Sequence, residues 1–380
     1  MIKKIFILFL FSLCLVPKIS FGSEIIEDKV KTEKAKVIEV VSETEEDLFG
    51  NNTISIVQEI KAEILSGDEK GRIVVFENDY TALEEGEKFF ILHVEKTDGT
   101  ERFMVSDPYR INILVILFII FVGAVYFFGK GSGLRGLISL SVSIIIIFAL
   151  LIPLLLRGYN PVLISVLVSS LIIILSSYIT HGFGKATNAA VIGMIISIII
   201  SGTLATLAVH FSGLTGFGSE ESVYLNFNTR GSLDLSGILL GGILIGLLGT
   251  LYDAAISQAI IVEELHRANP AMSKKEVYKR ALRVGREHIG ALVDTLAIAY
   301  LGAAMPLLLL LSSTGGQDLI PLINKEIISA EIVRILVGSI GVILSVPITT
   351  LVASRMLHGK IDLSSEPSHH GHSHSHGHIH

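Results

Sequence analysis

The sequence has almost no cysteine and little charge. Cys14 is the only cysteine among 380 residues, so the chain beyond it can form neither a disulfide framework nor a thiolate metal site. Charged residues make up 17% of the chain, whereas soluble domains carry roughly 25%. Basic residues form no broad surface, which excludes nucleic acid as an expected partner. With half of its residues hydrophobic, the chain has the composition of a membrane protein.

Catalytic motifs are also missing. The apolar segments contain no paired histidines at metal-ligand spacing, and the chain has no Ser-Gly nucleophile turn and no Walker-type phosphate loop. We therefore expect a protein that is not an enzyme.

The amino terminus has the pattern of a secretory signal peptide. Lys3 and Lys4 precede an apolar run over residues 5–16, and small residues follow. The run is short for a membrane span, which needs about 20 residues. We predict a signal peptide over residues 1–22, with an uncleaved anchor as the alternative.

Residues 23–107 have the character of a soluble β-rich domain. Short segments with alternating or β-branched residues are separated by Gly, Asn and Asp. They predict a small exported β-barrel or sandwich of the OB-like kind, which either caps the membrane domain or binds a partner outside. The expected strands are residues 36–41, 53–65, 71–77, 88–95 and 101–105.

Apolar segments fill the membrane domain that we expect over residues 108–357. Seven segments are long enough to cross a hydrocarbon core. Lys and Arg are concentrated in the connections that an outside amino-terminal domain would place inside, in agreement with the positive-inside rule. We expect an α-helical polytopic protein with seven transmembrane helices and a cytoplasmic carboxyl terminus. The expected spans are residues 112–128, 136–156, 161–180, 189–211, 237–260, 289–311 and 332–355.

Two aspartates stand inside these apolar segments. Asp253 and Asp294 each occupy a span that has no other acidic residue near its middle. A carboxylate within a membrane normally faces the bundle interior and marks function, although it can also hold helices together. Antiparallel helices would place both at one depth, as a site for a proton, another ion or a small solute. The other expected pathway residues are Thr250, Ser257, Gln258, Thr295 and Tyr300.

Glycines accompany the aspartates at helical spacing. Because small residues allow helices to approach closely in lipid, we expect the face that carries Asp253 to pack against protein. The expected packing positions are Gly242, Gly246, Gly249 and Gly290.

A charged excursion separates the fifth and sixth expected spans. Ser273 and Glu276 form a capping-box pattern at the start of a basic amphipathic helix over residues 273–288. This helix either lies along anionic lipid headgroups or docks a cytoplasmic partner.

The tail over residues 358–380 is polar and rich in histidine. Neutral imidazoles on such a backbone bind Zn²⁺ or Ni²⁺ opportunistically. The tail has few apolar residues with which to pack, so we expect it to be disordered. The expected metal ligands are His369, His370, His372, His374, His376, His378 and His380.

Four stretches resemble the YibE/F-like family of bacterial multi-span membrane proteins. The resemblance implies a polytopic protein of the bacterial cytoplasmic membrane with a β-rich domain outside, and it implies no defined biochemical role. The stretches are GKGSGLRGLISL at 129–140, PLLLRGYNP at 153–161, GLLGTLYDAAISQAIIVEEL at 246–265 and GREHIGALVDTLAIAYLGAAMPLLL at 285–309.

Two functions are consistent with these patterns. The first is a permease-like protein that moves an unidentified ion or small solute, coupled to protons through Asp253 and Asp294. The second is a non-transporting scaffold or regulatory subunit, which binds partners through its exported domain and its cytoplasmic helix.

The histidine tail gives a direct test. Immobilised Ni²⁺ should retain the untagged full chain and release a chain that lacks residues 358–380, because the remaining histidines are scattered through the sequence. Equal retention of the two chains in a column binding assay would contradict a tail that binds metal.

Overall fold

The computed structural model describes residues 29–47, 55–313 and 319–358. They form two compact units that divide between Phe128 and Gly129. The expected signal peptide and the tail histidines lie outside the described residues, so both stay predictions.

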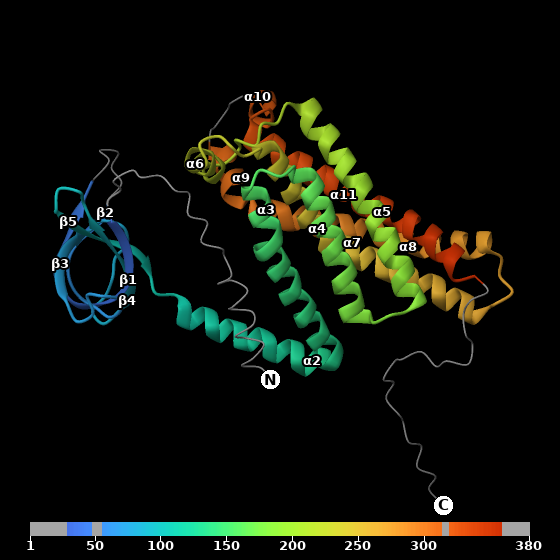
Figure 1. Ribbon diagram of the computed structural model, residues 1–380, viewed down its shortest axis with the longest axis horizontal. Coiled ribbons are helices and arrows are strands. Elements are labelled where there is room, and N and C mark those ends of the chain that lie inside the picture. Colours follow the sequence, from blue (N-terminus) through green and yellow to red (C-terminus); the bar gives the residue numbers. More distant parts are fainter. Residues whose placement is uncertain (1–28, 48–54, 314–318, 359–380) are drawn as a thin grey trace, which may run out of the picture. The chain divides into compact units, whose positions relative to one another are not determined.

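The first unit contains one antiparallel sheet, drawn in blue in Figure 1. The strands follow the spatial order β3-β2-β1-β4-β5, so the hydrogen-bonded ladder ends at β3 and β5. The expected five strands are confirmed, although β1 is much longer than the alternation predicted. Their bounds are β1 Lys29–Glu46, β2 Ser55–Ile64, β3 Ile73–Asn78, β4 Lys88–Glu95 and β5 Glu101–Pro108.

The sheet curls into a half-barrel rather than a closed barrel. The β1–β2 register shifts between Val37 and Glu39 and again between Val40 and Ser42, and such bulges bend and twist a strand. The bend encloses a core of alternate side chains, including the fully buried Ile60, which excludes water from one face. The strand alternation of the sequence therefore formed the expected core.

The second unit consists of helices. The start of α2 belongs to the first unit. The helices are α2 Ile111–Ile146, a π-helical turn at Ile147–Leu151, α3 Ile152–Leu156, α4 Pro161–His181, α5 Lys185–Ser212, α6 Glu220–Asn228, α7 Leu235–Ala268, α8 Lys274–Ala303, α9 Met305–Ser313, α10 Leu319–Ile323 and α11 Glu326–Met356.

Five helical stretches, rather than the expected seven, are long and apolar enough to cross a membrane within the described residues. One reason is that the first two expected spans are counted together in the stretch Ile111–Leu156. Two helices meet there at a kink at Lys130, where φ is 45° and ψ is −134°. The other four candidates are Pro161–His181, Lys185–Ser212, Leu235–Ala268 and Glu326–Met356.

The expected sixth span is divided. α8 runs without interruption from the charged excursion to Ala303, and the backbone leaves the helical region at Ala304 before α9 begins. Pro306 follows in the first turn of α9, where its missing N–H does no harm. Neither piece is therefore both long and apolar.

The basic amphipathic helix is the first half of α8. The Ser273 hydroxyl accepts a hydrogen bond from the Glu276 N–H at 3.3 Å, so the expected cap is confirmed. Val277 and Ala281 are fully buried in the protein core, whereas Val284 is 42% exposed. The apolar side of this helix thus packs on the helical bundle, and its contact with lipid headgroups or a partner stays a prediction.

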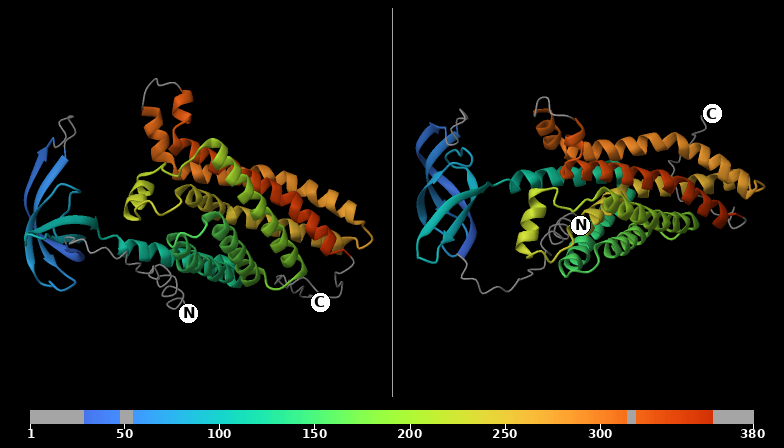
Figure 2. Two further views of the ribbon diagram at one scale, coloured as in Figure 1. Left: turned by 45° about the horizontal axis from the view of Figure 1, so that its top comes forward. Right: turned by 90° about the horizontal axis from the view of Figure 1, so that it is seen from above.

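The helix α11 is the central member of the bundle. It packs against α5, α7 and α8, and these four helices run side by side in Figures 1 and 2. Small residues permit the close approach: a Cβ added at Gly193 of α5 would lie 2.9 Å from the Thr349 Cα of α11. A second close contact joins Gly341 of α11 to Ser201 of α5. These contacts were not expected from the sequence.

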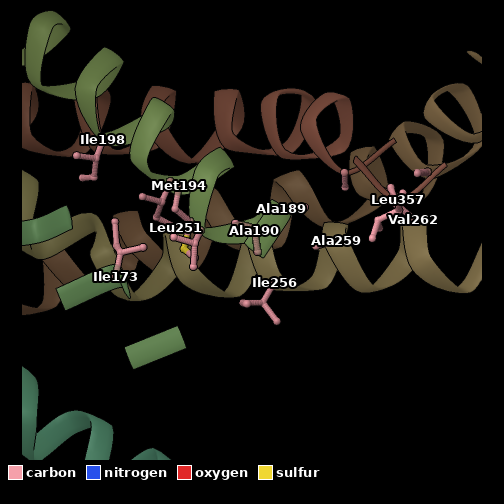
Figure 3. Close-up of a cluster of buried hydrophobic side chains, with 14 of the residues drawn as sticks. Ile173, Ala189, Ala190, Met194, Ile198, Leu251, Ile256, Ala259, Val262 and Leu357 are labelled. Atoms are coloured by element: carbon pink, nitrogen blue, oxygen red, sulfur yellow. The ribbon is translucent and has the colours of Figure 1, made fainter. Parts of the chain in front are cut away.

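Apolar side chains complete the core between α4, α5 and α7. Figure 3 shows Met194 of α5 beside Leu251 of α7, and both side chains are fully buried. The outer helix surfaces are also apolar, since Ile199 and Leu336 are each more than half exposed. Such a surface is suited to lipid rather than water.

Replacement of Gly193 by alanine should destabilise the protein. Because the added Cβ would collide with the Thr349 Oγ1 and lie 2.9 Å from the backbone Cα of Thr349, α5 and α11 must separate. Overpacking of this kind costs about 1–3 kcal/mol. We expect a lower melting temperature in detergent for Gly193→Ala. Gly302→Ala is the matched control, since its Cβ would meet open space. Equal melting temperatures for the two variants would contradict this packing.

Candidate functional site

A cavity of about 200 Å³ lies between α7, α8 and α11. The helix α7 contributes Asp253, Ser257 and Gln258 to its wall, and α8 contributes Thr295 together with His288. Four of the seven pathway residues expected from the sequence are thus brought together. Asp253 provides the only carboxylate in this wall.

Gln258 also holds the wall in place. Its side chain is 2% exposed, and its Oε1 accepts a hydrogen bond from the buried Thr350 hydroxyl of α11 at 2.9 Å. On its other side, a Cβ added at Gly285 of α8 would lie 2.5 Å from the Gln258 Nε2. Gln258 therefore bridges three helices at one end of the cavity.

Asp294 occupies a different position. Both aspartates are exposed, but Asp294 of α8 does not line the cavity that Asp253 lines. Its neighbour Thr295 does face the cavity, because adjacent residues on a helix point about 100° apart. The structure thus provides one carboxylate at this cavity instead of the expected pair.

The expected packing glycines behave in two ways. A Cβ at Gly246 would collide with the Tyr300 hydroxyl of α8, so Gly246 packs closely against that helix. At Gly242, Gly249 and Gly290 no atom of a neighbouring element lies within 4 Å of an added Cβ in the part of the chain that the structure describes. Along most of this face of α7, glycine leaves open space instead of bringing a helix closer.

A second cavity, of about 300 Å³, lies between α6, α7 and α11. Gly242 of α7 lines it, as do Glu331 and Arg334 of α11. Arg334 donates from Nη1 to the Glu331 Oε1 at 2.8 Å. This cavity therefore contains an arginine and a glutamate within or next to a membrane-spanning helix.

Tyr300 contacts α7 between Gly242, which lines one cavity, and Asp253, which lines the other. Its hydroxyl packs on Gly246, one turn beyond Gly242, and its ring centroid is 5.7 Å from the Arg334 Cζ. The hydroxyl is buried and has no hydrogen-bond partner among the described residues. Of the expected pathway residues, neither Tyr300 nor the half-buried Thr250 lines either cavity.

Sequence analysis missed Arg334 and Glu331. Both lie in α11, and Arg334 falls inside an expected span. The rule that selected the aspartates applies equally to an intramembrane arginine, so the signal was present.

This fold defines the class of the protein. The apolar surface and the five membrane-length helices make it a multi-pass integral membrane protein with a curled β-sheet before its helices. Residues 117–359 match the model of the YibE/F-like protein family, and residues 28–98 match that of the YibE/F family N-terminal domain. The chain belongs to this family. No curated protein and no solved structure matches it.

Gly246→Ala should destabilise the protein through a clash with the Tyr300 hydroxyl oxygen. The added methyl group overlaps the Tyr300 hydroxyl, so Tyr300 has to move and the melting temperature should fall by several degrees, as for about 1–3 kcal/mol of overpacking. Adding Tyr300→Phe removes that hydroxyl and should restore part of the loss. Gly249→Ala, one turn away in open space, is the control. If the double variant is as unstable as Gly246→Ala, the α7–α8 contact is misplaced.

Proposed function

We propose that the protein is a permease-like transporter for an unidentified ion or small solute, with Asp253 as its proton- or cation-binding group. The observation that carries the proposal is a pair of cavities along α7 and α11, of which one is also lined by α8 and the other by α6. A carboxylate in a spanning helix is costly unless it meets a partner or a mobile ligand. The cavity beside Asp253 has room for such a ligand.

The two cavities support an alternating pathway. Gly242 and Asp253 are 11 residues apart on α7, which corresponds to about 16 Å along the helix. In this proposal the Tyr300 ring, which contacts Gly246, separates the two cavities. Movement of this ring away from α7 would then open a path between them, and the open space at Gly249 leaves room for that movement.

In this proposal the polar side chains of the two cavities have different roles. Asp253 would bind the proton or cation, and Ser257 and Thr295 would supply neutral oxygen ligands from the same wall. Arg334 and Glu331 would form the entrance at the other cavity. In this proposal the cavity with Arg334 opens outside and the one with Asp253 opens to the cytoplasm, in accordance with the positive-inside rule. The expected cytoplasmic-membrane location is part of the proposal.

Flux through reconstituted vesicles tests the role of Asp253. A pH dye trapped inside should report proton movement when divalent metals or small solutes are added outside. Asp253→Asn should abolish this movement, because an amide has no ionised form. Asp294→Asn is the matched control and should keep it, since Asp294 lies outside the cavity. Loss of flux in Asp294→Asn but not in Asp253→Asn would show that Asp294, and not Asp253, binds the proton or cation.

A scaffold is the second candidate function. The exposed side of the first half of α8 carries Lys274, Lys275, Lys279, Arg280, Arg283 and Arg286. This basic surface would fit an acidic cytoplasmic partner or anionic lipid. If wild-type vesicles behave like empty vesicles for every solute and cross-linking captures a stoichiometric partner, the scaffold replaces the transporter.

A further inference from the structure

The open edges of the half-barrel meet at a charged cluster that the proposed transport does not use. Glu69 and Arg72 precede β3, His93 lies in β4, and Glu101 begins β5. Arg72 donates to Glu69 at 2.9 Å and also forms an ion pair with Glu101. One arginine thus connects the two carboxylates where the curled sheet brings β3 close to β5.

His93 is the unusual member of this cluster. It is 5% exposed and stacks on Phe103, with ring centroids 4.5 Å apart. Its Nε2 is buried and has no hydrogen-bond partner in the part of the chain that the structure describes. The same nitrogen lies 3.7 Å from the Glu101 Oε1, and the Nδ1 lies 3.8 Å from the Glu69 Oε2. The imidazole is thus directed into the two carboxylates.

The donor set has the chemistry of a metal site. One ligand atom from each of Glu69, His93 and Glu101 lies within 4.8 Å of the others. Imidazole nitrogen and carboxylate oxygen are ligands that Zn²⁺ accepts, commonly with water in the fourth position.

We propose that Glu69, His93 and Glu101 form a binding site for a divalent transition-metal ion, typified by Zn²⁺. Metal bonds of about 2.0–2.2 Å require the three side chains to draw together. Arg72 forms ion pairs with both carboxylates when no metal is bound. Its side chain is 40% exposed, so it can rotate toward the solvent when the ion binds. The bound ion would connect β3, β4 and β5 and fasten the open side of the half-barrel.

Zinc binding tests the site in a chain that ends at His358. This chain keeps every described residue and lacks the tail histidines, which would bind zinc themselves. After treatment with a chelator, equilibrium dialysis against ZnCl₂ should load one zinc per chain. His93→Ala should weaken binding by more than about 100-fold, because even outer-shell partners of a metal are worth 10–100-fold. His210→Ala, an exposed histidine elsewhere, should bind as the parent does.

Two further variants distinguish a metal site from an ion-pair network. Arg72→Gln should tighten zinc binding, because it removes the competitor for both carboxylates. Glu69→Gln is nearly isosteric and should weaken binding, with loss of the visible absorption bands of bound Co²⁺. The Glu69→Gln variant replaces His93→Ala in this test if His93→Ala does not fold. Equal zinc content in the parent, His93→Ala and Glu69→Gln, or weaker binding in Arg72→Gln, would overturn the proposal.

Discussion

The close approach of α11 to its neighbours governs the helical unit. Lipid is as apolar as a leucine side chain, so helices in a membrane gain little from burying apolar surface against each other. They associate where small residues allow close approach, as Gly193 does at Thr349 and Gly341 does at Ser201. Through these contacts α11 holds α5, and it also packs along α7 and α8. The positions of the cavity walls follow from that packing.

The same helices are loosely packed on the α8 side, and the polar residues gather there. The glycines of α7 that leave space, Gly242 and Gly249, alternate with Gly246, which Tyr300 fills. Along one face of α7, Gly242 thus lines a cavity, Gly246 contacts Tyr300 and Gly249 leaves open space. Gln258 stabilises the wall through Thr350, so the cavity beside Asp253 does not depend on the carboxylate for its shape.

The β-unit follows the physics of a water-soluble domain. Alternate side chains make one apolar face, and bulges in β1 bend the sheet over it. The buried Asn78 donates to the Gln58 Oε1 at 3.2 Å, which satisfies polar atoms inside this core. At the open side, charged groups take the place of a strand ladder, since Arg72 reaches from the start of β3 to Glu101 of β5.

The sequence by itself determined the strands, the apolar character of the helices and the cap at Ser273, because these depend on local periodicity and local hydrogen bonds. It also singled out Asp253, since a carboxylate is conspicuous among apolar residues. Only the tertiary structure decided that α8 breaks at Ala304, and that Asp253 lines a cavity while Asp294 does not. Helical spacing defines which residues share a face, but the neighbouring helix decides whether a glycine on that face makes a contact or leaves a space.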